Sequence, residues 1–323
     1  MTQRILDPEQ IQVQDPSAIP RIRLPERATH FRERAARLRK LADHNPIGGY
    51  VRLMAALVDA QQHALEHLEA QMPPREAIVN AQRHSMPILP ALGSERDPQW
   101  RAVLRCLADR VEAAGAVTPA LAKVLDTLRA MNDAELDAQA DALLAQRHTE
   151  IAPATAPFIM AALQVVWTDL ASRVSVDDVP YMDSPGVCPV CGVPPVASIV
   201  RVGGAMQGYR YVQCSLCGTE NHVVRVKCTN CDSTKGIAYH VMGSGEESED
   251  EQAATAKSAP LKAESCDECG TYRKIGYQDK AYDFEPYADD LASLTLDLLM
   301  GDAGYRRAAP NPWLWPEQSE EDR

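Results

Sequence analysis

The sequence predicts an α+β protein of several domains: an all-α domain over residues 25–176, then a duplicated β region over 185–283 with two four-cysteine metal sites, and a C-terminal helix and tail over 284–323. Three observations lead to this prediction. Apolar residues recur at three- and four-residue steps through the first half of the chain, as in amphipathic helices. Beyond residue 186 apolar residues alternate, as in strands. Eight of the nine cysteines form four pairs of identical spacing between 188 and 269.

Composition narrows the class of protein. The chain has 323 residues, 45% of them hydrophobic, which is enough for domains with real cores. Its 33 Lys and Arg against 45 Asp and Glu give a net charge of −12, which argues against a general nucleic-acid binder. The first residues lack a signal-peptide core, and the most apolar stretch, 156–167, falls far short of the roughly 20 residues of a membrane span. We therefore expect a soluble cytoplasmic protein without membrane insertion.

The first half of the chain predicts an arm followed by helices. Proline among polar residues over 1–24 indicates an extended N-terminal arm. Thr118-Pro119 provides an N-cap and a first-turn proline, and Asn132 provides a second N-cap. The stretch between the Pro73-Pro74 stop and Pro98 is expected to be irregular. Helices are expected over about 26–44, 51–68, 100–111 and 119–128, from 133 onwards, and over 156–172.

A loop rich in turn-forming residues over 176–186 marks the boundary with the β region. Short strands are expected around 197–202, 209–212 and 223–226. The acidic segment 246–260 is expected to be a mobile loop inserted into the second half of this region. One amphipathic helix over about 286–300, a tail and a solvated end at 317–323 complete the chain.

The cysteine pairs share the spacing Cys-x-x-Cys. Two thiolates three residues apart can bind one metal ion from a tight turn, and backbone N–H groups of that turn donate to the sulfurs. Glycines follow Cys191, Cys217 and Cys269, where such turns favour a positive φ. Because a tetrahedral thiolate site needs four sulfurs, four pairs predict two metal ions per chain. The candidate ligands are Cys188, Cys191, Cys214, Cys217, Cys228, Cys231, Cys266 and Cys269.

An internal repeat indicates how the pairs combine. Each unit consists of a Cys-x-x-Cys turn, two strands and a second turn that ends in Cys-x-x-Cys-Gly-Thr, which is the layout of a zinc ribbon or a rubredoxin-like fold. The first ribbon, 185–227, then combines the first two pairs in one site, and the second ribbon, 228–283, combines the last two. A cross-braced pairing of alternate turns is the alternative. Zinc would only stabilise the fold of each ribbon, whereas iron would add redox activity.

Other candidate residues have simpler interpretations. His63 and His67 share a helix face, but they lack the glutamate of His-Glu-x-x-His, so we interpret them as solvated. His222 and His240 are interpreted as plain strand residues. Cys106 lies in an apolar stripe and is expected to be a core thiol.

Four basic residues are expected to give the first ribbon a basic surface: Arg201, Arg210, Arg225 and Lys227. This surface is either a docking surface for an acidic partner or a set of solvated strand edges. The sequence shows no phosphate-binding loop, no dinucleotide fingerprint and no nucleophile motif. No catalytic residue, no cofactor besides the metals, no small-molecule substrate and no enzyme activity are therefore predicted.

Longer motifs surround the cysteines. The chain carries Cys188-Pro-Val-Cys191-Gly, Tyr209-Arg-Tyr, Glu220-x-His222-Val-Val-Arg-Val-Lys-Cys228-x-Asn-Cys231, Lys262-Ala-Glu-Ser-Cys266-x-x-Cys269-Gly-Thr-Tyr272 and Ala288-Asp-Asp-Leu-Ala-Ser-Leu. The first half carries Arg37-Leu-Arg-x-Leu-Ala42-x-x-Asn45-Pro and Ala156-Pro-Phe-Ile. Together these motifs resemble the FdhE family, the formate dehydrogenase accessory proteins, over nearly the whole chain. All eight paired cysteines match, and the insertion at 246–260 has no place in the pattern.

The resemblance implies a non-enzymatic cytoplasmic maturation factor that is required for the assembly and activity of formate dehydrogenase. It also implies binding of the molybdenum- or tungsten-containing catalytic subunit before twin-arginine export, and iron in rubredoxin-like sites. Two other hypotheses stay open. A rubredoxin-like electron-transfer protein acting during maturation would show a ferric–thiolate spectrum that bleaches reversibly, and a zinc-ribbon nucleic-acid-binding protein would show salt-dependent binding to DNA or RNA.

Overall fold

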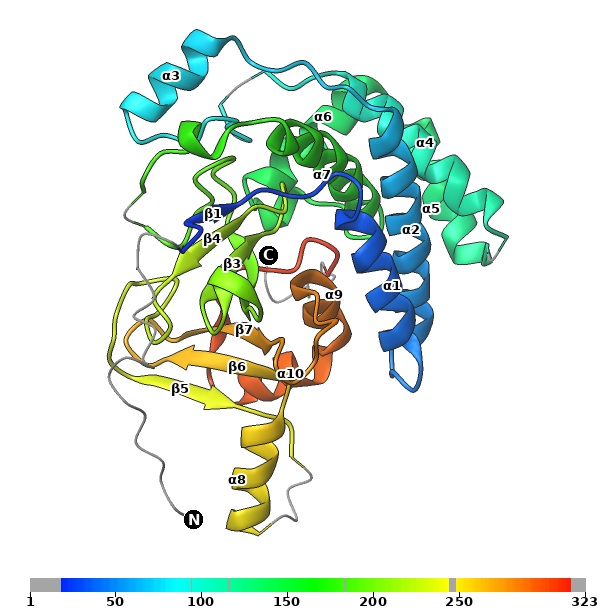
Figure 1. Cartoon of the computed structure of the whole chain (residues 1–323). Helices are drawn as coiled ribbons and strands as arrows, with labels where there is room; N and C mark the ends of the chain where they lie inside the picture. Colours follow the sequence, from blue (N-terminus) through cyan, green and yellow to red (C-terminus); the bar gives the residue numbers. More distant parts are fainter. Residues whose placement is uncertain (1–18, 94, 116, 183, 244–247, 315–323) are drawn as a thin grey trace.

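The computed structural model describes residues 19–93, 95–115, 117–182, 184–243 and 248–314 (Figure 1). Its first part is helical and is organised around one central helix, α7, in which every residue from Ala156 to Ala171 is buried. A helix that is buried on all sides needs neighbours on all sides, and the helices before it supply most of them. The helices of this part are α1 (His30–Ala42), α2 (Gly48–His67), α3 (Arg75–Arg83), α4 (Gln99–Ala113), α5 (Pro119–Ala130), α6 (Asp133–Leu144) and α7 (Ala156–Ser172).

Two of the predicted helix starts are confirmed in atomic detail. The Thr118 hydroxyl accepts a hydrogen bond from the backbone N–H of Leu121 at 3.2 Å. Asn132 and Glu135 form a capping box, in which each side chain accepts from the backbone N–H of the other. The expectation of an irregular stretch after Pro74 is wrong for α3. Pro74 stands directly before that helix, where its missing N–H costs nothing, and only Ile78 is buried, so no apolar stripe signals the helix.

The strands of the second part, joined by β1 from the N-terminal segment, form one continuous sheet in the order β1-β4-β3-β2-β7-β6-β5, and β8 pairs with β7 beside this path. The antiparallel strands β2, β3 and β4 come from the first unit of the repeat, and β5, β6 and β7 come from the second. The units meet where β2 and β7 pair in parallel. The strands are β1 (Ile22–Arg23), β2 (Pro195–Val200), β3 (Arg210–Cys214), β4 (Glu220–Val223), β5 (Ile237–His240), β6 (Leu261–Cys266), β7 (Thr271–Tyr277) and β8 (Arg306–Arg307).

The N-terminal arm joins the sheet at one edge. Residues 1–18 of the arm lie outside the described part of the chain. The described end of the arm contains β1, which pairs with β4. The strand expected around 223–226 ends earlier, at Val223, and the side chains of Val224 and Val226 are exposed. The domain boundaries at 24, 176, 227 and 283 stay predictions.

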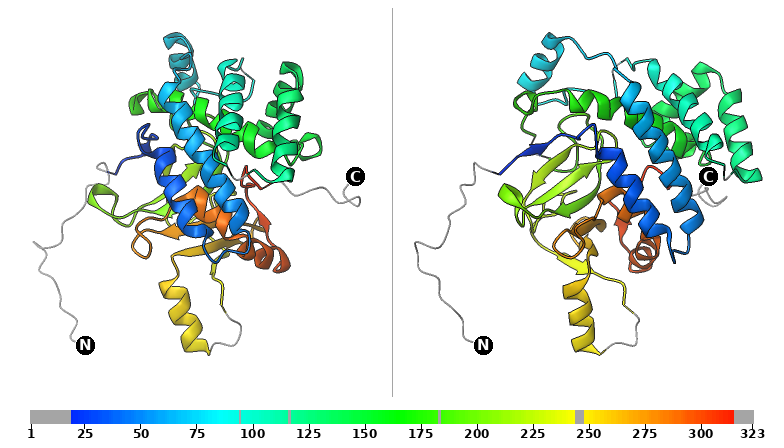
Figure 2. Two further views of the ribbon diagram at one scale, coloured as in Figure 1. Left: turned by 90° about the vertical axis from the view of Figure 1, so that its right-hand side faces the viewer. Right: turned by 45° about the vertical axis from the view of Figure 1, so that its right-hand side comes forward.

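The acidic segment contains a helix, so the prediction of a mobile loop is wrong for its described residues. Helix α8 (Glu249–Ser258) begins with a capping box, because Ser248 and Glu251 each accept from the backbone N–H of the other. This Ser-x-x-Glu signal is present in the sequence. The helix projects away from the sheet (Figure 2). Residues 244–247 lie outside the described part of the chain.

The predicted C-terminal helix is divided into α9 (Pro286–Ala292) and α10 (Leu294–Asp302), which meet at Ser293. The cause is the fully buried Lys274, whose ammonium group donates to the carbonyl oxygens of Asp290 and Ser293 at 2.8 and 3.1 Å. The chain then returns to the helical part, where Trp313 is buried. Residues 315–323, including the expected solvated end, lie outside the described part. No helix in the described part has the length and apolar character of a membrane span.

Candidate metal centres

The eight paired thiols gather in two sets, each with its sulfurs within 4.8 Å of one another. Cluster 1 consists of Cys188, Cys191, Cys214 and Cys217, and cluster 2 consists of Cys228, Cys231, Cys266 and Cys269. The repeat predicts this grouping, and the cross-braced alternative does not match it. None of the eight cysteines forms a disulfide.

The sulfur distances fit a metal ion in each cluster. A tetrahedral ion bound at about 2.3 Å places its sulfurs about 3.8 Å apart. In cluster 1 the Sγ atoms of Cys188 and Cys217 are 3.6 Å apart, and in cluster 2 those of Cys228 and Cys269 are 3.8 Å apart. Four thiolates so close together repel one another unless a cation lies between them. The donor set suits zinc or iron equally.

The same backbone turn opens both clusters. In cluster 1 the N–H of Gly192 donates to the carbonyl oxygen of Cys188 at 2.8 Å, and the N–H of Val190 donates to its sulfur at 3.4 Å. In cluster 2 Asp232 and Asn230 repeat these bonds to Cys228 at 3.1 and 3.4 Å. Backbone N–H donation to sulfur stabilises the thiolate form, which is the form that binds metal.

The Cys-Gly-Thr ending of each unit also has a structural reason. Gly218 and Gly270 have φ values of +75° and +63°, a conformation that side chains disfavour. The hydroxyl oxygen of Thr219 then lies 3.2 Å from the sulfur of Cys217, and that of Thr271 lies 3.0 Å from the sulfur of Cys269. In the sequence these threonines mark only the repeat. Their recurrence was the signal that each one supports a sulfur.

Cluster 1 is enclosed by the helical part of the molecule. The N–H groups of Leu89 and Ala91 donate to the carbonyl oxygens of Val190 and Cys191 at 2.8 and 3.0 Å. The amide of Gln164, on α7, donates to the carbonyl oxygen of Ser215 at 2.8 Å. All four cysteines of the cluster belong to the main hydrophobic core of the protein. Burial raises the pKa of the Cys188 and Cys191 thiols well above the ordinary value, so a bound cation is needed to hold them as thiolates.

Cluster 2 lies at the surface. Cys231 is exposed and Cys269 is half-buried. Burial raises the pKa of Cys266 to about 12. Burial also acts on Cys269, but hydrogen bonds from Thr271 and Asn230 outweigh it and lower the pKa of that thiol to about 6. Because Cys231 is exposed, solvent and a partner molecule can reach this cluster.

The remaining histidines and Cys106 form no metal centre in the described part of the chain. The rings of His63 and His67 are 4.5 Å apart, and His67 is exposed. His222 lies in β4 between two tyrosine rings, and His240, in β5, lies 2.8 Å from the Ser265 hydroxyl. Both are strand residues, as predicted. Cys106 packs against the main core but is only partly buried, so the prediction of a buried core thiol is only half met.

The prediction of a basic surface on the first ribbon is wrong. Arg210 is fully buried and forms two hydrogen bonds with the Glu264 carboxylate at 2.9 and 2.7 Å. Arg201 is paired with Glu220, and Lys227 is paired with Asp232. The sequence pattern shows the positive residues together but not the acids that folding brings beside them. Arg225 is the one exposed member of the group that has no acidic partner among the described residues.

The fold and the two clusters define the class of protein: a helical domain whose core continues into a duplicated four-cysteine ribbon. Sequence models described as "FdhE, N-terminal", "FdhE, central domain" and "FdhE, C-terminal domain" match residues 19–183, 187–225 and 226–314. The chain therefore belongs to the FdhE family.

Individual relatives agree over almost the whole length. The chain is 39% identical to a protein FdhE homolog of Cronobacter sakazakii, over 99% of this chain and 100% of the relative. It is 40% identical to protein FdhE of Escherichia coli, over 94% of this chain and 93% of that protein. The crystal structure of the FdhE protein from Pseudomonas aeruginosa, at 33% identity, superposes with a TM-score of 0.77, covering 93% of this chain and 100% of that one.

Proposed function

We propose that this protein is a non-enzymatic accessory factor for the assembly and activity of formate dehydrogenase. In this proposal it acts in the cytoplasm and binds the catalytic subunit of that enzyme before twin-arginine export. Membership of the FdhE family over nearly the full chain carries the proposal. A protein that holds a client needs surfaces more than a catalytic residue, and the exposed second cluster offers such a surface.

The proposal includes one metal ion in each cluster, bound by the eight cysteines. A closed four-thiolate site stabilises a small β unit that has little core of its own, whichever metal is present. Iron, which the family resemblance favours, adds one-electron chemistry, and zinc does not. Around either ion the backbone N–H groups and the threonine hydroxyls hold the sulfurs in place.

The first experiment is anaerobic purification of the protein from its own cells, followed by mass spectrometry of what accompanies it. We expect the formate dehydrogenase catalytic subunit with its export signal still attached. A Cys231→Ser variant should lose the client, while Cys106→Ser, which changes a thiol outside both clusters, should keep it. Recovery of nucleic acid, or of no formate dehydrogenase, contradicts the proposal. A client that lacks its signal contradicts binding before export.

Electron transfer during maturation is a second candidate function, because the exposed Cys231 brings cluster 2 to the surface. Electron transfer requires a redox-active metal within reach of a partner, and zinc cannot supply it. Protein loaded with iron and protein loaded with zinc should then differ in their ability to restore formate dehydrogenase activity in cells that lack this chain. Equal restoration by both forms rules out electron transfer.

A further inference from the structure

The glycine of the Cys-Gly-Thr ending has different surroundings in the two clusters. In cluster 2 a Cβ added at Gly270 would meet no described residue within 4 Å besides its chain neighbours. In cluster 1 a Cβ added at Gly218 would overlap the Cε1 and Nε2 atoms of His30. The imidazole ring of His30 therefore packs directly on the backbone that follows Cys217. The repeat forms the same turn twice, but only the turn of cluster 1 has a side chain packed on this glycine.

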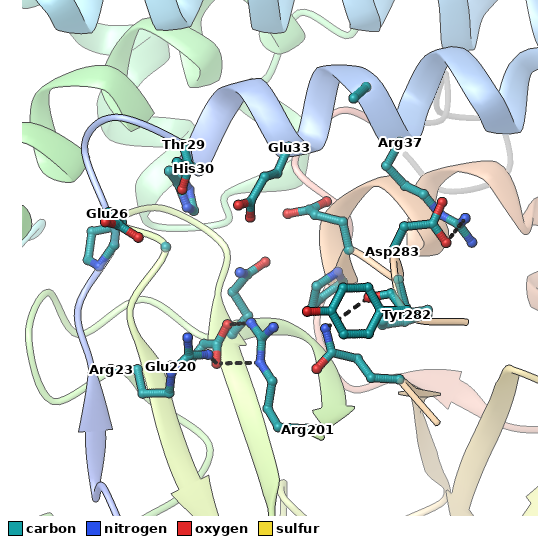
Figure 3. A pocket seen from close by; sticks show the side chains of 18 of the residues that line it. Arg23, Glu26, Thr29, His30, Glu33, Arg37, Arg201, Glu220, Tyr282 and Asp283 are labelled. Carbon is teal, nitrogen blue, oxygen red and sulfur yellow. Dashed lines mark hydrogen bonds and ion pairs between the residues drawn. The ribbon is translucent and has the colours of Figure 1, made fainter. Parts of the chain in front are cut away.

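His30 is held in one orientation by a hydrogen bond. It is the first residue of α1, and Figure 3 shows it at the edge of a polar pocket that Arg201 and Glu220 also line. Its Nε2 lies 3.1 Å from Nη2 of Arg34. A guanidinium group only donates, so Nε2 accepts and Nδ1 carries the proton of the neutral ring. Burial, and then the charge of Arg34, lowers the pKa of His30 well below its ordinary value, which keeps the ring neutral.

Arg34, which holds His30, is itself fixed by the C-terminal part of the chain. Its side chain is buried, and its Nε donates to the Glu285 carboxylate at 3.0 Å. Its guanidinium group also lies over the Tyr287 ring, 4.5 Å from the ring centre. An arginine bound by an acid and stacked on an aromatic ring has little freedom left to lose. The His30 ring therefore cannot turn away from Gly218 without breaking its bond to a fixed partner.

The N-terminal segment also holds the other side of the same turn. Glu220, two residues beyond Gly218, forms an ion pair with Arg23 at 2.6 Å. These two residues face each other where β1 pairs with β4. The segment from β1 to the start of α1 therefore contacts the chain after Cys217 at two points, through Arg23 and through His30.

We propose that His30 is a positioning residue of cluster 1, whose ring holds the turn at Cys217 and Gly218 in the conformation that binds metal. Metal sites depend on groups outside the ligand set that orient the ligands. Glycine has more backbone freedom than any other residue, so a ring packed on Gly218 restricts where the Cys217 sulfur can lie. Cluster 2 has no such support at Gly270. The inference rests on the part of the proposed function that places a metal ion in cluster 1, whether iron or zinc.

The test measures Co²⁺ binding to the full-length chain carrying Cys231→Ser, so that only cluster 1 keeps four sulfurs. Cobalt in a thiolate site absorbs visible light, and competition with a chelator of known affinity gives its affinity. We expect His30→Ala to weaken binding about tenfold, as loss of a supporting group commonly does. His30→Gln keeps an acceptor for Arg34 but not the ring, so its loss should be about threefold. His84→Ala removes an exposed histidine at the end of α3 and should change the affinity by less than about twofold.

A double variant tests the contact itself. Gly218→Ala places a methyl group where the His30 ring lies, whereas His30→Ala empties that space. Adding Gly218→Ala to His30→Ala should therefore weaken Co²⁺ binding at least about threefold less than adding it to the parent chain. Losses that simply multiply overturn the inference, because they show that the ring does not act through the glycine.

Two further outcomes separate this inference from the proposal on which it rests. Far-UV circular dichroism first shows which variants are folded. If His30→Ala binds Co²⁺ as tightly as the parent chain, the positioning role is overturned while the metal site stands. If His30→Ala does not fold, an unchanged affinity in His30→Gln overturns the role in the same way. If the parent chain binds no Co²⁺, the metal part of the proposed function fails, and the inference fails with it.

Discussion

Clusters 1 and 2 have the same ligands, the same opening turn and the same Cys-Gly-Thr ending, yet they occupy opposite environments. Cluster 1 is part of the main core and is covered by α7 and by the loop at residues 87–91. Cluster 2 lies in the outer unit, where Cys231 is exposed. The repeat determines how the sulfurs are arranged. The surroundings determine how strongly the rest of the protein depends on them.

The two units also differ in the core that supports them. The first unit contributes residues to the same hydrophobic cluster as α2, α4 and α7. The second unit shares a small separate cluster with α10, built from Ala263, Tyr272, Leu296 and Met300. A defect in cluster 1 should therefore spread into the helical part, whereas a defect in cluster 2 should stay local.

The largest expected difference is between Cys191→Ser and Cys231→Ser in the metal-loaded protein. Cys191→Ser leaves three buried thiolates with an incomplete metal site, and we expect it to lower the free energy of unfolding by about 3 kcal/mol or more. At the exposed Cys231 position water can replace the lost sulfur, so we expect a loss of about 1 kcal/mol. Urea unfolding followed by far-UV circular dichroism measures both. Equal losses would mean that burial of the cluster does not decide its structural role.

Limited proteolysis sharpens the same comparison. Cys191→Ser should expose cleavage sites in the helical part as well as in the first ribbon, because the two share one core. Cys231→Ser should add cleavage sites only within 228–283. Cleavage confined to the first ribbon in Cys191→Ser would show that the helical part is stable without cluster 1.

Metal removal is the next test. With a chelator in excess, we expect one metal ion per chain to leave more than tenfold faster than the other, because dissociation needs access to the ligands. The fast ion belongs to cluster 2, so Cys231→Ser should abolish the fast phase and leave the slow one unchanged. A colorimetric chelator that reports free metal over time gives both phases. A single phase for both ions contradicts the asymmetry.

Much of this comparison could be predicted from the sequence, and the environment of each cluster could not. The spacing of the cysteines and the recurrence of Cys-Gly-Thr are local signals, so the two sets of ligands and their grouping follow from the chain alone. Whether a cluster is buried depends on long-range contacts. Leu89 lies about a hundred residues before Val190, yet the backbones of the two are hydrogen-bonded.

The same limit explains the sequence predictions that were wrong. Arg210 looks like a surface residue of an alternating strand, but Glu264, from the other unit, lies beside it and makes its burial possible. The break between α9 and α10 at Ser293 depends on Lys274, which lies on strand β7. By contrast, the Ser-x-x-Glu capping box of α8 is a local signal, but the acidic composition around it favours the prediction of a loop.

A smaller effect is expected from the threonines that support the sulfurs. Thr219→Val and Thr271→Val each remove the hydroxyl near a cysteine sulfur while keeping the side-chain shape. We expect each change to weaken metal binding at its own cluster about tenfold, as loss of a ligand's hydrogen-bond partner commonly does. Competition with a chelator of known affinity measures this. The effect should be larger at Thr219, since water can replace the lost hydroxyl at the exposed cluster. An equal effect at both positions would show that solvent does not compensate.

The smallest expected effect is at Asp232 (φ +67°), the residue after the first turn of cluster 2, whose counterpart in cluster 1 is Gly192 (φ +81°). An added Cβ at Gly192 would lie 3.2 Å from Pro87, and a left-handed backbone strains alanine, so Gly192→Ala should cost about 1–2 kcal/mol. Asp232→Gly relieves that strain but loses the ion pair with Lys227 and gives the unfolded chain more freedom, so the change should stay within about 0.5 kcal/mol. Urea midpoints of the two metal-loaded variants give both values. A larger loss from Asp232→Gly than from Gly192→Ala would contradict this expectation. It would mean that the ion pair at the exposed turn of cluster 2 stabilises the protein more than the close packing at the buried turn of cluster 1.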